Sequence, residues 1–304
     1  MASQEQKTIN DCFQPAFKLV KPQGGCDNRA ARFIFSSPHS GRIYPPSFLD
    51  SSNLSAKQLR SSEDAYVDEL FAHTSNQGAH FIHSLVPRAY LDLNRQPYEL
   101  DPQLFAGQLP DFATSDTVKV KSGLGVIARI VSEGREIYTE QLDIDEALKR
   151  INNLYFPYHG ALRSLIETVG KKHQQAILID CHSMPSTTLP GFKLTPPDFV
   201  LGNLFDKSCN YELTHLVRSQ LQAMGYIVSV NKPYAGGYVT KEYGRPANGV
   251  HVLQIEINRE LYLDERNVEK TPGFDSLRKN LRRLTKTLIE ALPDLALETR
   301  LAAE

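Results

Sequence analysis

The sequence lacks several features that would assign it to a class of protein at once. No apolar run approaches the roughly 20 residues that span a bilayer. The polar start MASQEQKTINDCFQ has neither the basic nor the apolar segment of a secretory signal. With 34 Lys and Arg against 35 Asp and Glu, the formal net charge is −1, which offers no overall attraction to nucleic acid or acidic membranes. We therefore expect a cytoplasmic protein with neither a nucleic-acid nor a membrane partner.

Cysteine is also scarce. The 4 cysteines are Cys12, Cys26, Cys181 and Cys209, and none forms a CxxC pair. This scatter is typical of reduced, structural thiols rather than of a disulfide framework. Cys181 stands beside His182 and could serve as a nucleophile, but no second feature supports that role, and packing is the commoner role for a cysteine at a strand end.

The chain does contain apolar strand patterns that alternate with amphipathic helical patterns. Such alternation predicts βαβ units. We therefore expect one α/β domain over residues 31–304, with a mixed, mostly parallel sheet and helices on both faces, preceded by an N-terminal arm at residues 1–30. Strands are predicted within 31–41, 79–95, 176–180, 226–230 and 249–261, and helices over 59–78, 145–175 (bent or broken near Pro157), 210–225 and 272–295.

Polar side chains gather where several of these strands end. The run AILID leads directly into CHS, and ligands of open α/β sheets bind at the carboxyl ends of strands. The stretches are PHSG with His39, SEDAYVD with Asp64 and Asp68, DLNR with Asn94 and Arg95, DCHS with His182, and QIEINRE with Glu256.

This set of groups matches the needs of a hydrolytic zinc site. A catalytic zinc often takes two histidines and one carboxylate and leaves a position for water, whose proton a second carboxylate can accept. Glu256, flanked by Ile255 and Ile257, is the candidate for that second carboxylate. The alternatives are an ion pair of Glu256 with Arg259 and a purely structural, hydrogen-bonded role for His182.

Seven motifs together resemble the N-formylglutamate amidohydrolase family. They occur in the family's order and span about residue 32 to about residue 290, nearly the whole chain. The motifs are SSPHSG, SEDAYVDELF, LDLNRQPYELDP, GLGVIARIVSEGREIY, DCHSMP, PYAGGYVTKEYGRP and VHVLQIEINRELYLDE.

The resemblance implies a fold like that of the zinc carboxypeptidases and aspartoacylases. It also implies that His39 and His182 bind zinc and that Glu256 is the general base. Asn94 and Arg95 would hold the carboxylate of an N-acyl amino acid, a task that suits the planar fork of arginine.

The third metal ligand is open between two acids. Zinc carboxypeptidases supply their first two ligands as HxxE, but His39 is followed by Ser-Gly-Arg, so the acid must come from elsewhere. Asp64 and Asp68 lie four residues apart on one face of the predicted helix. We prefer Asp64, because the start of that helix is closer to the sheet edge. Zinc is the expected ion, although iron, manganese and cobalt also suit two histidines and a carboxylate.

Further candidates lie in two other motifs. Arg129 and Arg245 are candidates for binding an anionic side chain or the oxyanion that forms during the reaction, with a surface salt bridge as the alternative for each. The segment AGGYVTKEYG has no phosphate-loop pattern. We interpret it as a loop that lines the mouth of the site, with Tyr238 and Tyr243 as possible contacts.

The expected activity is zinc-dependent hydrolysis of N-formyl-L-glutamate to formate and L-glutamate, which the resemblance places in histidine breakdown. Asn203 and Leu204 stand where the family commonly has Asp-Arg, so another N-acyl amino acid or a small peptide stays open as the substrate. A binding protein that has the pocket but no turnover is the third interpretation.

Overall fold

The computed structural model of the protein describes residues 13, 15–23, 28–131, 134–187 and 196–291. The chain clusters into two compact units. The first comprises Met1–Lys18, His39–Glu63 and Ser84–Gly160, and the second comprises Leu19–Pro38, Asp64–His83 and Ala161–Glu304. The division into an arm at residues 1–30 and a domain at residues 31–304 stays a prediction.

The second unit is built on a seven-stranded sheet in the order β1-β3-β2-β6-β9-β7-β8. Neighbouring strands run parallel at β3–β2, β2–β6, β6–β9 and β7–β8, and antiparallel at β9–β7. The predicted mixed, mostly parallel sheet is therefore confirmed. The strands are β1 Phe17–Val20, β2 Phe33–Ser37, β3 His80–Ser84, β6 Ala176–Met184, β7 Phe199–Gly202, β8 Val228–Val230 and β9 Val250–Asn258.

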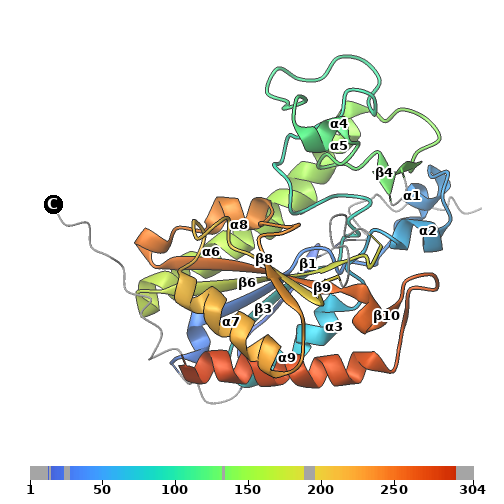
Figure 1. Cartoon of the computed structure of the whole chain (residues 1–304). Coiled ribbons are helices and arrows are strands. Elements are labelled where there is room, and N and C mark those ends of the chain that lie inside the picture. The colour runs from blue at the N-terminus through green and yellow to red at the C-terminus, as the bar shows by residue number, and fades with distance from the viewer. Residues whose placement is uncertain (1–12, 14, 24–27, 132–133, 188–195, 292–304) are drawn as a thin grey trace, which may run out of the picture. The chain divides into compact units, whose positions relative to one another are not determined.

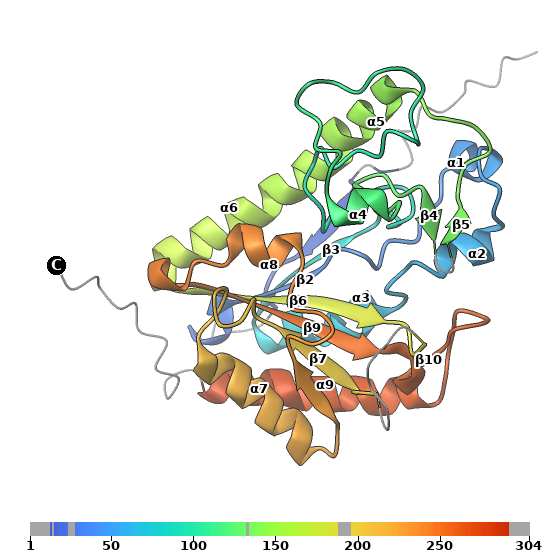
Figure 2. The same cartoon turned by 45° about the horizontal axis from the view of Figure 1, so that its top comes forward.

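Helices cover both faces of this sheet, as predicted (Figure 1). One face carries α3 Val67–Phe71, α7 Tyr211–Ala223 and α9 Gly273–Ala291, which share a single apolar core with the strands. The other face carries α8 Tyr238–Tyr243 and the part of α6 Phe156–His173 that belongs to the second unit (Figure 2).

The apolar core shows why the strands face as they do. Phe35, Ile179 and Ile255 all belong to the core with α3, α7 and α9, and all are 0–1% exposed. Successive side chains of a strand point to opposite faces. The residues next to Phe35, Ile179 and Ile255 in their own strands must therefore point to the face of α8. The polar residues of the motifs occupy those intervening positions.

The first unit contains short elements joined by long loops. Its core includes Arg150, which is 3% exposed. The guanidinium lies 3.9 Å from the ring centroid of Tyr90 and donates to the hydroxyl of Tyr138 at 2.8 Å. It also forms an ion pair with Glu146. The elements are α1 Pro46–Asp50, α2 Ala56–Arg60, α4 Val118–Lys121, β4 Ile130–Val131, β5 Arg135–Glu136 and α5 Ile144–Arg150.

Where the helix was predicted to bend or break, near Pro157, the chain forms a π-helical turn, Ile151–Tyr155, between α5 and α6. The backbone N–H of Phe156 donates to the carbonyl of Ile151, five residues back. Pro157 has no backbone N–H and cannot donate the next helical hydrogen bond, and the wider π-helical turn accommodates it within the helix.

The single helix predicted over residues 59–78 is wrong in one respect. The chain forms α2, then a non-helical segment, then α3 and the 3-10 helix Ala72–Gln77. The break ends at Tyr66, whose left-handed conformation with φ of 62° a continuous helix could not contain. Asp64 therefore precedes α3 and does not share a helix face with Asp68.

Part of the predicted arm is ordered as edge strand β1, which neighbours β3. Cys12 and Cys26 lie outside the described residues. No helix in the described part of the chain is long and apolar enough to cross a membrane. The remaining short elements are the 3-10 helices Ala30–Arg32, Pro246–Asn248 and Arg259–Leu261 and the hairpin of β10 Leu263–Asp264 and β11 Glu269–Lys270.

We predict that His73 makes the second unit sensitive to acid. Its ring lies between the carbonyl of Leu70 (2.9 Å) and the hydroxyl of Thr285 on α9 (3.2 Å). Burial lowers the pKa of His73 from 6.5 to about 4. Between these pH values the unfolded chain binds a proton that the folded chain does not, so stability falls as the pH drops from 6.5 toward 4.

In urea titrations, wild type should lose about 3 kcal/mol more than His73→Gln between pH 7.5 and pH 4. Curves of unfolding free energy against pH that run parallel for the two proteins would contradict this assignment.

Candidate functional site

The polar residues of β6 and β9 meet in register on the face of the sheet that carries α8. Asp180 pairs with Gln254, and His182 pairs with Glu256. Partners in a parallel pair point to the same face, and so do residues two apart on one strand. The strands thus place an imidazole, two carboxylates and an amide side by side. The sequence predicts His182 and Glu256 at the carboxyl ends of these two strands.

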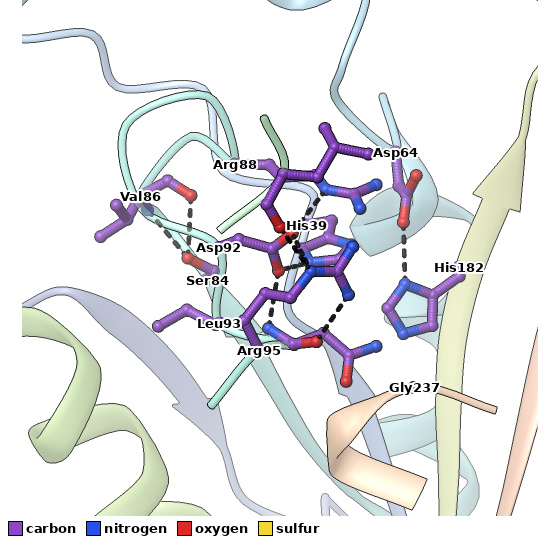
Figure 3. Close-up of polar contacts among 12 residues, drawn as sticks. His39, Asp64, Ser84, Val86, Arg88, Asp92, Leu93, Arg95, His182 and Gly237 are labelled. Carbon is purple, nitrogen blue, oxygen red and sulfur yellow. Dashed lines mark hydrogen bonds and ion pairs between the residues drawn. The ribbon is translucent and has the colours of Figure 1, made fainter. Parts of the chain in front are cut away.

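His182 lies between two carboxylates. Its Nε2 is 2.9 Å from Oδ2 of Asp180. Its Nδ1 is 2.9 Å from Oδ2 of Asp64, the contact drawn in Figure 3. All three side chains are at most 2% exposed. Burial disfavours the charged imidazole, but the carboxylates of Asp180, Asp64 and Glu256 outweigh it, so the pKa of His182 lies well above its usual value.

Asp64 is itself fixed by Arg259 and Ser183. Nη2 of Arg259 lies 3.1 Å from Oδ1 of Asp64, and the Ser183 hydroxyl donates to the same oxygen at 3.3 Å. Nε of Arg259 donates to the Ser183 hydroxyl at 3.1 Å. We did not predict this use of Arg259, which the sequence suggested only as a partner of Glu256. Its one signal was a basic residue just past the polar end of a buried strand.

Of the two acids proposed as the third ligand, Asp64 is the one that the fold holds against His182. Asp68 lies on α3, with its carboxylate 3.9 Å from Nδ1 of His83. Asp64 as the third ligand stays a prediction, whereas its expected place in the first turn of a long helix is wrong.

His39 belongs to the first unit, where Asp92 anchors it. Nε2 of His39 lies 2.7 Å from Oδ1 of Asp92 (Figure 3). The same oxygen accepts from the backbone N–H of Asn94 at 2.8 Å, and Oδ2 of Asp92 accepts from Nε of Arg88 at 3.0 Å. Burial raises the pKa of Asp92, but Arg88, His39 and Arg95 hold it well below its usual value. An ionised Asp92 only accepts, so Nε2 of His39 carries a proton.

Asn94 and Arg95 lie in the same group of residues as His39. Asn94 is 4% exposed. Arg95 donates through Nε to the carbonyl of Leu124 and through Nη1 to the carbonyl of Asn94, both at 3.0 Å. These bonds use only part of the guanidinium's donors and hold its plane in place, as a carboxylate-binding arginine requires.

The other predicted binding residues have structural partners. Arg129 donates to the buried Asp101 at 2.8 Å and to the exposed Glu136 at 3.1 Å. Arg245 is exposed and donates to the carbonyls of Lys241 (2.9 Å) and Gly244 (2.6 Å) at the end of α8.

Tyr238 is half-buried at the first position of α8. The catalytic role suggested for Arg129 and the substrate-binding roles suggested for Arg245 and Tyr238 stay predictions.

Cys181 and Asn203 both have buried, structural positions. The Cys181 side chain is fully buried, and burial together with the charge of Asp180 raises the pKa of its thiol well above the usual value, which opposes a nucleophilic role. Asn203 is also fully buried and bonds Asp206 and Thr214. It thereby braces a turn whose residues 204–206 all have positive φ.

Residues 31–263 match the N-formylglutamate amidohydrolase family. The chain is 27% identical over 262 residues to the N-formylglutamate deformylase of Pseudomonas putida, covering 85% of this chain and 91% of that one. It is 25% identical over 235 residues to the N-formylglutamate deformylase of Pseudomonas aeruginosa, covering 76% and 82%.

Solved structures agree. The crystal structure of N-formylglutamate amidohydrolase from Ralstonia eutropha JMP134 matches with a TM-score of 0.84 and 32% identity, covering 92% of this chain and 99% of that one. A protein of Agrobacterium tumefaciens shares the fold, with a TM-score of 0.62 and 16% identity over 91% of this chain and 94% of that one. The chain belongs to the N-formylglutamate amidohydrolase family, as its motifs indicated.

We predict that Gly41 is required to hold the His39 loop. A β-carbon at Gly41 would lie 2.0 Å from the carbonyl oxygen of Val86, so even alanine must push the backbones apart. Gly41→Ala should lower the unfolding free energy by about 2 kcal/mol or more, measured by urea denaturation.

Gly170→Ala is the control, because nothing lies within 4 Å of a β-carbon at that position in α6. Alanine in a helix interior should stabilise by up to about 1 kcal/mol. Equal stability of Gly41→Ala and wild type would refute the close approach.

Proposed function

We propose that the protein hydrolyses the amide of N-formyl-L-glutamate to formate and L-glutamate. The observation that carries this proposal is the pairing of His182 with Glu256 at the ends of β6 and β9, with Asp64 against the imidazole. A metal-binding imidazole beside a carboxylate able to move a proton is the minimum for metal-assisted hydrolysis. The similarity to deformylases of two Pseudomonas species supports the choice of substrate.

We propose further that His39, Asp64 and His182 hold one divalent ion, with zinc the favoured metal. The donor set fits, because two imidazoles and a carboxylate are common ligands of catalytic zinc. Asp92 and Asp180 each hold the Nε2 of one histidine, which directs both Nδ1 atoms to be the ligand atoms. His39 follows Ser37, the last residue of β2, by two positions, and β2 neighbours β6.

Such an ion would act as a Lewis acid toward the acyl oxygen and would make a neighbouring water more acidic. Glu256 takes a proton from the attacking water as the water oxygen bonds to the formyl carbon. It returns a proton to the amide nitrogen as the C–N bond breaks. Asn94 and Arg95 hold the substrate carboxylate, for which the braced guanidinium supplies parallel donors.

The direct test combines metal content and formate release on one purified sample with N-formyl-L-glutamate. We expect one zinc per chain, and formate release that chelation abolishes and added zinc restores. Zinc without formate release would move the substrate to another N-acyl amino acid or a small peptide, to be found with a panel of such compounds. If the protein binds no metal and shows no turnover after metal is added, the proposed reaction is wrong, and the interpretation as a binding protein is the one that is left.

Glu256→Gln tests the general base. The variant should bind metal as wild type does and lose on the order of 100-fold or more in kcat, because the amide cannot accept the proton. Glu260→Gln is the matched control, since Glu260 is exposed just beyond the same strand. Glu256→Gln with more than about a tenth of wild-type activity would remove Glu256 from this role.

A further inference from the structure

Gln254 is a buried polar residue that the proposed reaction does not yet use. It lies on β9 and is 3% exposed. In the sheet it is flanked by Asp180 of β6 and Gly202 of β7. Because it stands two residues before Glu256, both side chains point to the face that carries α8. A buried amide needs partners for its carbonyl and for its NH₂ group.

The partners of Gln254 fix the orientation of its amide. Its Oε1 lies 2.7 Å from the backbone nitrogen of Gly237 and 3.4 Å from the hydroxyl of Thr240. A backbone N–H can only donate, so the atom that faces Gly237 must be the oxygen. The NH₂ group is thereby turned to Glu256, where Nε2 donates to Oε1 at 2.8 Å. The carboxylate of Glu256 cannot rotate without breaking this bond.

The loop that supplies the Gly237 N–H is itself held against the sheet. A β-carbon at Gly202 would lie 2.8 Å from the carbonyl carbon of Ala235 and 2.8 Å from the nitrogen of Gly236, so the loop rests directly on the glycine backbone. The N–H of Leu204 donates to the carbonyl of Ala235 at 2.8 Å. The loop therefore gives Gln254 a firm anchor at the start of α8, the segment labelled at Gly237 in Figure 3.

We propose that Gln254 is a positioning residue that orients the carboxylate of Glu256 for proton transfer and ties it to the Ala235–Gly237 loop. The proposal rests on the function proposed above, in which Glu256 is the base. An oriented, ionised carboxylate is the state that a general base needs before the water attacks, and misplacement of such a group slows the chemistry more than it weakens binding.

Two variants separate orientation of the base from support of the fold. Gln254→Glu keeps an acceptor for the Gly237 N–H but removes the donor to Glu256 and sets two carboxylates together. The exchange variant Gln254→Glu/Glu256→Gln restores an amide–carboxylate pair with the two roles exchanged. Gln222→Glu, at an exposed position of α7, is the matched control.

Steady-state kinetics and urea denaturation are measured on all proteins. Gln254→Glu should lose on the order of 100-fold in kcat while KM changes by less than about threefold, and it should be less stable than wild type. The exchange variant should regain stability but not turnover, because its carboxylate stands at the wrong position. Gln222→Glu should match wild type in both measurements.

Three results would overturn the proposal. They are a kcat of Gln254→Glu within about twofold of wild type, a change confined to KM, and an exchange variant no more stable than Gln254→Glu. Inactive wild-type protein would instead remove the proposed function, and the stability of the exchange variant would still report whether the two side chains bond.

Discussion

The register between β6 and β9 is the constraint on which the site depends. It sets Asp180 opposite Gln254 and His182 opposite Glu256, while Ile179 and Ile255 turn into the apolar core on the other face. Because the side-chain period of a strand is two, a slip of one residue would turn the polar groups into the apolar core and the apolar side chains to the face of α8. The large apolar core with α3, α7 and α9 therefore fixes the geometry of the polar face as well as the stability of the sheet.

Burying so many charged groups requires that each be compensated. An ionised carboxylate in a dry interior is costly unless charges and hydrogen bonds surround it. Asp64 is bonded by His182, Ser183 and Arg259, and in the first unit Asp92 is bonded by His39 and Arg88. The bonds of Asp92 and Asp180 to Nε2 of His39 and His182 leave Nδ1 of each ring to face the proposed ion. The hydrogen bonds that stabilise the buried charges thus also orient the proposed ligand atoms.

Much of this could be predicted from the sequence, because the signals are local. Apolar runs that end in polar residues predicted the strands, and the motif around His182 predicted its place at the sheet edge. The break before α3 could not be predicted, since it depends on the left-handed conformation of Tyr66, a residue with no turn preference of its own. The contacts of Arg259 were missed because Asp64 and Ser183 lie far away in the chain. The bond between Gln254 and Glu256 was missed because it depends on the Gly237 N–H, which fixes the amide from another element.

The central proposal is a divalent ion held by His39, Asp64 and His182 beside Glu256. Anomalous diffraction at the zinc edge, from crystals grown without added zinc, tests it most directly. We expect one strong peak at bonding distance from Nδ1 of both histidines and from a carboxylate oxygen of Asp64. A peak at other residues, or peaks on surface side chains alone, would contradict it.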